Sequence, residues 1–196
     1  MGSARQNNER DLGKILKMLI HSATSINYLG RNLRINSPSE FSSDSTILVL
    51  TKKIKIPCGI KEKTRITSEE IAKSNGLRKF LKFSEGTSVK VGSFEIKMAE
   101  SSGDKSKFNF FINDELYFMT FLPEIRFPFP ENITLLIQAD PDYFSENDFQ
   151  EIEKFIAGSG PEKTIISGHY SEEWFQTFKN RKNIEVRNEI SQQTIF

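Results

Sequence analysis

The sequence predicts a single-domain α/β protein in which mixed sheets carry helices on their outer faces. Its 196 residues are enough for one substantial core. Alternating apolar residues predict hairpins between residues 89 and 120, and strands alternate with amphipathic helices from residue 133 onward. Residues 1–10 are polar and are interpreted as a disordered N-terminus or a cloning remnant, which leaves residues 11–196 as the domain.

The first third of the chain predicts two helices and a strand. Apolar residues at helical spacing near the start indicate a helix: Leu12, Ile15, Leu16, Leu19 and Ile20. The short apolar run TILVL at residues 46–50 is typical of a buried strand. The sequence TSEE at residues 67–70 predicts a capped helix start, and Asn75-Gly76 predicts its end.

The middle of the chain predicts two hairpins. Alternating apolar residues flank Gly92-Ser93 over residues 89–96. A second alternating pair, residues 108–112 and 116–120, flanks Asn113-Asp114.

The last third alternates strands with helices. Strands are predicted at residues 133–137, 163–167 and 184–187; helices are predicted from a cap at Ser145 to Gly158 and over residues 171–182. This order favours an α/β architecture.

Composition narrows the functional classes. The single cysteine excludes an internal disulfide or a multi-cysteine metal site and points to a reducing cytoplasm. No apolar run is long enough to span a membrane, so no membrane partner is expected. Residues 52–97 carry twelve basic against five acidic residues. The section from 52 to 90 is therefore either a set of solvated strand edges or a patch that faces nucleic acid phosphates.

Few residues offer catalytic chemistry. His21 and His169 are the only histidines, and His169 follows a predicted strand, at the kind of position where α/β sites collect. Asp140 and Asp142 follow another predicted strand; they are either a carboxylate pair or the residues of a simple turn.

The order of elements resembles the metallo-β-lactamase fold. That family places a loop of the form H-x-H-x-D-H after a helix and strand, and KMLIHSATSINYLGRNLRI has this outline with His21 at the first histidine. The later stretch TIISGHYSEE places His169 at the family's final histidine. The resemblance covers roughly residues 12–196 and implies mixed sheets with flanking helices. It also implies a truncated relative, because too little chain precedes His21 for the family's opening strands.

Most of the family's metal ligands are missing at the matched positions. Ala23, Ser25 and Ile26 replace the second histidine, the aspartate and the third histidine. The turn at residues 100–104 has no histidine, and residues 117–121 have no bridging aspartate. A catalytic zinc needs about three protein ligands and a water, so the sequence predicts no catalytic residues and no cofactor.

The resemblance therefore implies a pseudoenzyme that binds or scaffolds a protein partner or a second copy of itself. Inactive members of this superfamily pair with active relatives, often in nucleic-acid processing. The alternative is a metal-dependent hydrolase or nuclease that holds zinc with His21, His169 and Asp104, since two histidines and a carboxylate form an acceptable zinc set.

The segment FLPEIRFPFPEN at residues 121–132 is the candidate partner-binding loop. Its three prolines exclude a central strand. Arg126, Phe127 and Phe129 are the residues expected to contact a partner. The same phenylalanines would equally suit a connector whose rings fill the core.

Overall fold

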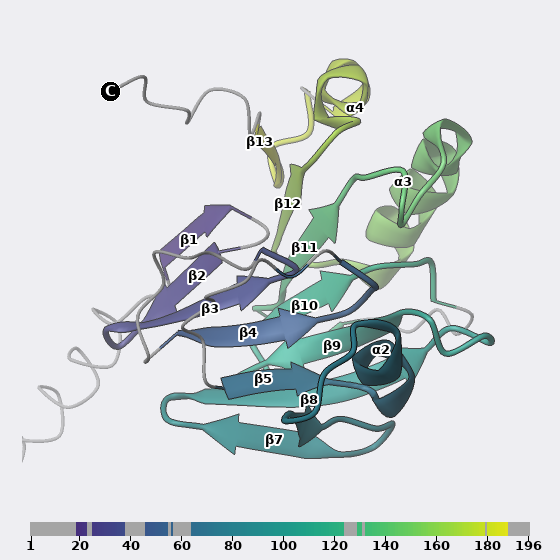
Figure 1. Ribbon diagram of the computed structural model, residues 1–196. Coiled ribbons are helices and arrows are strands. Elements are labelled where there is room, and N and C mark those ends of the chain that lie inside the picture. Colours follow the sequence, from purple (N-terminus) through teal and green to yellow (C-terminus); the bar gives the residue numbers. More distant parts are fainter. Residues whose placement is uncertain are drawn as a thin grey trace, which may run out of the picture.

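The computed structural model describes residues 19–22, 25–37, 46–54, 56, 64–123, 129–130, 132–178 and 180–187. These residues form two sheets that lie face to face, with two helices beside the second sheet (Figure 1). No helix among them combines the length and the hydropathy that a membrane crossing requires.

The first sheet has the strand order β1-β2-β3-β4-β5-β6. Its first three strands pair antiparallel, and the pairs from β3 to β6 are parallel. The strands are β1 (Leu19–Ser22), β2 (Ser25–Tyr28), β3 (Arg31–Ile35), β4 (Ile47–Leu50), β5 (Thr64–Thr67) and β6 (Leu81–Lys82).

The second sheet has the strand order β13-β12-β11-β10-β9-β8-β7. Strands β7 to β10 pair antiparallel, whereas β10 to β13 pair in parallel. The strands are β7 (Ser88–Val91), β8 (Phe94–Ser101), β9 (Phe108–Ile112), β10 (Leu116–Met119), β11 (Thr134–Gln138), β12 (Lys163–Ser167) and β13 (Ile184–Arg187).

Two of the helical segments begin at serine caps. Helix α2 (Glu69–Ser74) is capped by the Ser68 hydroxyl, which accepts a hydrogen bond from the backbone N–H of Ile71. The short helix η1 (Glu146–Asp148) leads into α3 (Phe149–Ser159), which ends at Gly160 in the left-handed conformation. Helix α4 (Ser171–Phe178) precedes β13.

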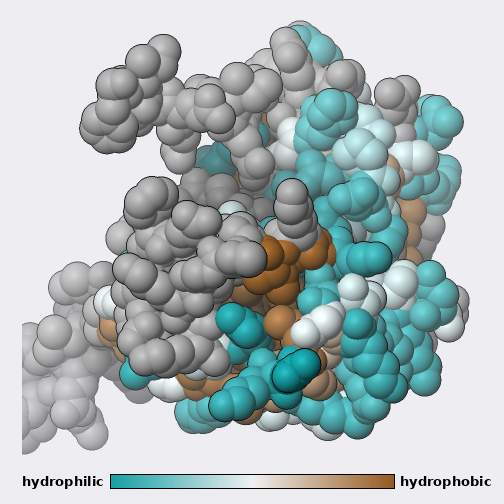
Figure 2. All heavy atoms as spheres, in the orientation of Figure 1, coloured by the Kyte–Doolittle hydropathy of each residue, from teal (hydrophilic) through white to brown (hydrophobic). Residues whose placement is uncertain are grey.

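Two hydrophobic clusters separate three layers. The first lies between the sheets and joins residues such as Leu48 and Ile66 to Phe94 and Phe110. The second lies between the second sheet and helices α3 and α4, and includes Phe155 and Trp174. Figure 2 shows hydrophilic side chains over much of one described face, with a hydrophobic area near its centre.

The mixed α/β class and the second half of the chain agree with the sequence prediction. Both hairpins form, at β7–β8 and β9–β10, and β12 and β13 have the predicted bounds. Helix α3 ends at Ser159 rather than Gly158, and α4 ends at Phe178 rather than residue 182.

The beginning of the chain differs from the prediction. Leu19 and Ile20 belong to strand β1 and not to a helix, whereas Leu12, Ile15 and Leu16 lie outside the described residues. Residues 25–35 form β2 and β3 where the family's metal-binding loop was expected. The Leu29-Gly30 turn between β2 and β3 explains the difference, because both residues have positive φ values and reverse the chain. His21 therefore lies within strand β1 and not in a ligand loop, while the expectation that the family's opening strands are missing stays a prediction.

Candidate functional site

A cleft of about 190 Å³ lies where strands of the two sheets end close together. Strands β3 and β4 of the first sheet supply Asn36 and Lys52 just beyond their last residues. Strand β11 of the second sheet is followed by Asp140 and Tyr143. The ends of parallel strands are where α/β proteins place their binding groups, so this cleft is the candidate functional site.

A buried network of neutral polar groups joins the two sheets in this cleft. Asn36 accepts a hydrogen bond from the backbone N–H of Thr51 at 2.8 Å, and its amide donates to the Thr51 hydroxyl at 2.6 Å and to the Tyr143 hydroxyl. The Tyr143 hydroxyl lies 2.7 Å from the Thr51 hydroxyl. Burial raises the pKa of Tyr143, so this group stays a neutral phenol.

Lys52 places a positive charge beside this network. Its ammonium lies 2.5 Å from a carboxylate oxygen of Asp142 and 4.7 Å from the centre of the Tyr143 ring. The hydrogen bond from Lys52 lowers the pKa of Asp142. Lys107 lies 5.8 Å from the centre of the same ring and donates to the backbone carbonyl of Tyr143 at 3.4 Å. The cleft is therefore lined by one ammonium, Lys52, and one carboxylate, Asp140, together with neutral polar groups.

Asp140 organises the turn that carries His169. One of its oxygens accepts the backbone N–H of His169 at 2.8 Å, and the other accepts the Gln138 amide at 2.7 Å. Gly168 has a φ of 118°. A Cβ at this position would lie 2.7 Å from Oδ1 of Asp140, the oxygen that accepts the hydrogen bond from His169. The turn is thus built around the carboxylate, which favours the structural role of Asp140 over that of a free acid.

The three residues of the zinc alternative lie in different elements of the fold. His169 is exposed, and its ring packs against Tyr170 at 5.3 Å between centroids. Asp104 lies in the β8–β9 turn, where hydrogen bonds from Ser102 and Ser106 lower its pKa to about 2. His21 lies in β1. No group of three or more histidine, cysteine or carboxylate side chains in the described part of the chain is arranged to hold a metal ion.

The predicted partner-binding residues are only partly described. Phe129 is 8% exposed, and its ring packs against Tyr117 at 5.0 Å and Phe155 at 5.9 Å. A ring enclosed in this way fills the core, so Phe129 is not available as a surface anchor and this part of the expectation is corrected. Arg126 and Phe127 lie outside the described residues, and their contact with a partner stays a prediction.

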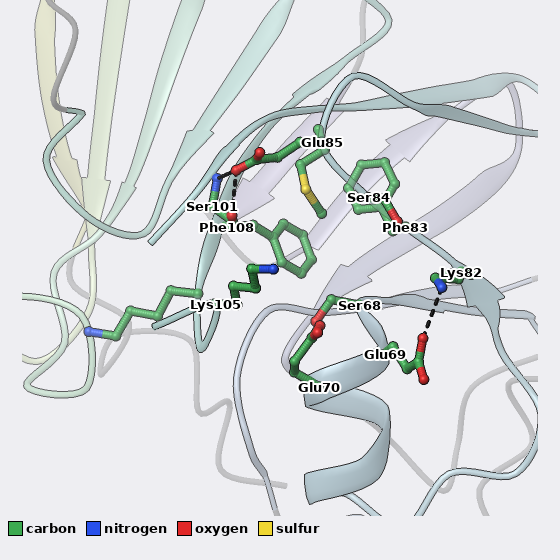
Figure 3. Close-up of a pocket in the computed structure, with 12 residues that line it drawn as sticks. Ser68, Glu69, Glu70, Lys82, Phe83, Ser84, Glu85, Ser101, Lys105 and Phe108 are labelled. Atoms are coloured by element: carbon green, nitrogen blue, oxygen red, sulfur yellow. Dashed lines mark hydrogen bonds and ion pairs between the residues drawn. The ribbon is translucent and has the colours of Figure 1, made fainter. Parts of the chain in front are cut away.

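A second cavity, of about 320 Å³, lies between the start of α2 and the β8–β9 hairpin (Figure 3). Phe83, Met98 and Phe108, all buried, form its apolar lining. Lys82 donates to Glu69 at 2.8 Å, and together with Lys73 it lowers the pKa of Glu69 to about 2. This cavity combines an apolar lining with a rim whose charges partly neutralise one another.

The cleft residues carried only weak signals in the sequence. Asn36, Thr51 and Lys52 directly follow β3 and β4, so their position after strands was the available signal. In the sequence, Lys52 is only one of the twelve basic residues of the section 52–97. Its ion pair with Asp142 joins residues 90 positions apart, which no local pattern predicts.

Comparison with solved structures assigns the fold. The chain is similar to a candidate metal-dependent hydrolase from Parabacteroides distasonis, with 14% identity, a TM-score of 0.60, and 87% of this chain and 91% of that one covered. It is also similar to the metallo-β-lactamase fold protein YhfI from Bacillus subtilis, with 11% identity, a TM-score of 0.58, and 84% and 86% of the two chains covered. A diphosphatase of the PhnP family has 8% identity and a TM-score of 0.55, with 83% and 79% covered.

These similarities define the class: the protein has the metallo-β-lactamase fold, with two mixed sheets and flanking helices. No family model matches the chain, and no curated protein matches it. At such low identity the similarity establishes the fold and not the activity.

Proposed function

We propose that this protein is a non-catalytic binding protein, a pseudoenzyme built on the metallo-β-lactamase fold. One observation carries the proposal: the ammonium of Lys52 lies in the cleft at the sheet ends, paired with Asp142 and packed over Tyr143. A fixed ammonium group repels a divalent cation, and it occupies an available carboxylate.

The donor set of the cleft also disagrees with a catalytic zinc. The hydroxyls and amide of Asn36, Thr51 and Tyr143 are committed to one another. Zinc sites are built from thiolates, imidazoles and carboxylates. Both oxygens of Asp140, the carboxylate that holds the His169 turn, already accept hydrogen bonds. We therefore derive no metal-dependent step at this cleft.

The proposed partner is a protein, bound at the cavity beside α2. Its lining of Phe83, Met98 and Phe108 suits an apolar side chain, and the rim charges of Glu69 and Lys82 suit the polar groups of a surrounding peptide. A second copy of the chain is one such partner. An association with a nucleic-acid-processing enzyme is what the fold resemblance implies and is included in this proposal.

Metal content tests the proposal. The purified protein, incubated with zinc or manganese and then freed of excess metal, is expected to retain far less than one metal ion per chain by mass spectrometry. His169→Ala is the matched variant, because its side chain is exposed and its removal leaves the Asp140 turn intact. Stoichiometric metal in the wild type that falls in His169→Ala would support the hydrolase with His21, His169 and Asp104, and would overturn the proposal.

A further inference from the structure

A third hollow, of about 270 Å³, lies on the first sheet, distinct from the cleft and from the cavity beside α2. It is lined by Thr64 and Arg65 of strand β5 and by Lys79, Phe80 and Leu81 at the start of β6. Two of the five lining residues are cations, and none is a carboxylate. Such a hollow attracts an anion.

Arg65 projects toward the outer face of the sheet. Its neighbour Ile66 is fully buried in the cluster between the two sheets. Because successive side chains of a strand point to opposite faces, the guanidinium of Arg65 lies on the face turned away from the second sheet. The hollow is therefore open to a ligand from outside the sandwich.

The Arg65 side chain also has an unsatisfied donor. Its Nε is buried and has no hydrogen-bond partner within the described structure. A buried N–H without an acceptor destabilises the folded state, and native proteins rarely contain such a group. A phosphate in the hollow would bind the guanidinium fork of Arg65, which lines the hollow and matches phosphate geometry.

Three other cations of the basic section form ion pairs within the fold. Lys52 pairs with Asp142, and Lys73 and Lys82 both pair with Glu69. Among the described residues, no carboxylate forms an ion pair with Arg65 or Lys79. Within the described residues, Arg65 and Lys79 therefore leave positive charge for a ligand at this hollow.

We propose that this hollow binds a phosphodiester of single-stranded nucleic acid. Arg65 and Lys79 contact the phosphate oxygens, and the neighbouring base stacks on the partly exposed ring of Phe80. An aromatic platform beside cations is the usual means of holding a single strand without reading its sequence. Leu81, which is 42% exposed, extends the apolar surface for the base. The inference rests on the proposed binding function and names one of its ligands.

Fluorescence anisotropy with a labelled oligo(dT) of about twelve nucleotides tests the inference. At low salt we expect binding that weakens about tenfold in Arg65→Gln and severalfold in Lys79→Ala. Removing a single phosphate interaction should reduce the slope of log affinity against log salt by about 0.7. Lys182→Ala is the matched control, because Lys182 is also exposed but lies before β13; its affinity should equal that of the wild type.

Two further measurements distinguish single-stranded nucleic acid from inorganic phosphate and from a duplex as the bound ligand. Phe80→Leu should weaken oligo(dT) binding while leaving competition by inorganic phosphate unchanged. A duplex of the same length should bind less tightly than the single strand, because its bases are not free to stack. An equal decrease in affinity in Lys182→Ala, equal binding of the duplex, or no binding of oligo(dT) at low salt would each overturn the inference.

Arg65→Gln changes a partly buried residue and could unfold the protein, so the test also uses substitutions at more exposed positions. Arg65→Gln is checked by circular dichroism; if it unfolds, the exposed Lys79→Ala and the partly exposed Phe80→Leu carry the comparison. Absence of oligo(dT) binding would not affect the measured metal content. Failure of this inference is therefore distinguishable from failure of the proposed function.

Discussion

Removal of one hydroxyl from the cleft should destabilise the whole fold. The Tyr143 hydroxyl is buried and bonds to Asn36 and Thr51, so it joins the loop after β11 to the ends of β3 and β4. Tyr143→Phe keeps the ring but leaves these partners with fewer hydrogen bonds. Asn36 and Thr51 still bond to each other, which limits the decrease in unfolding free energy to about 1–2 kcal/mol. For a chain of this size that corresponds to a fall of about 3–6 °C in Tm.

Tyr28→Phe is the matched control for this measurement. Tyr28 packs against Phe94 with 6.0 Å between ring centroids, and its hydroxyl has no hydrogen-bond partner within the described structure. This substitution should change the unfolding free energy by less than about 0.5 kcal/mol. Thermal and urea unfolding of the two variants measure the difference. If Tyr143→Phe were as stable as Tyr28→Phe, the network would not join the sheets as argued.

The pH dependence of the same variant gives an independent check. Burial raises the pKa of Tyr143 above its usual value of 10.0. The folded state therefore keeps the phenol neutral, while the unfolded state begins to ionise near pH 10. The stability that Tyr143 contributes is fully present below about pH 10 and is lost as the pH rises through its folded pKa. The advantage of the wild type over Tyr143→Phe should shrink in that range and not at neutral pH.

Three further substitutions test other parts of the structure. Phe129→Ala should cost about 3–5 kcal/mol of unfolding free energy, measured by urea unfolding, because it removes a buried ring from the second cluster. Gly168→Ala should lower Tm by several degrees, since a Cβ at that positive φ would meet Asp140. Hydrogen bonds from Arg187 and Lys163 lower the pKa of Glu185 to about 2 from 4.5. The stability that Glu185 contributes is therefore present above pH 4.5 and lost as the pH falls toward 2; Glu185→Gln should flatten an acid unfolding curve there.

The sequence predicted the second sheet better than the first. The β9–β10 hairpin forms as expected because Asn113 and Asp114 both adopt positive φ values, which their side chains tolerate. Strands β12 and β13 carry continuous or alternating apolar residues that local patterns identify. In these segments the local preference agrees with the tertiary structure.

In the first sheet, the apolar run at residues 46–50 correctly predicted β4, whereas the other strands were not predicted, for identifiable reasons. Strands β1 and β2 have four residues each, and β6 has two, which is too short for periodicity to emerge. The chain reverses between β2 and β3 at Leu29, a residue that rarely adopts a positive φ. The structure places His21 in strand β1 and not in the ligand loop that the resemblance predicted.

The sequence predicted the position of the candidate site residues less completely than it predicted the fold. His169 does follow a strand, as predicted, whereas local patterns allow Asp140 and Asp142 to be either a carboxylate pair or a turn. The structure uses the two aspartates separately: Asp140 holds the backbone of the His169 turn, while Asp142 pairs with Lys52. That division depends on contacts between two sheets, and such contacts follow only from the assembled fold.

The cleft and the hollow on the first sheet differ in whether their polar groups have partners. In the cleft, the Asn36–Thr51–Tyr143 network and the Lys52–Asp142 pair link loops of the two sheets through groups that are mutually satisfied. Buried polar groups that are satisfied by one another stabilise a unique arrangement without an external ligand. The unsatisfied donor of Arg65 lies elsewhere, on the outer face of the first sheet, which is why we place nucleic acid binding there and not in the cleft.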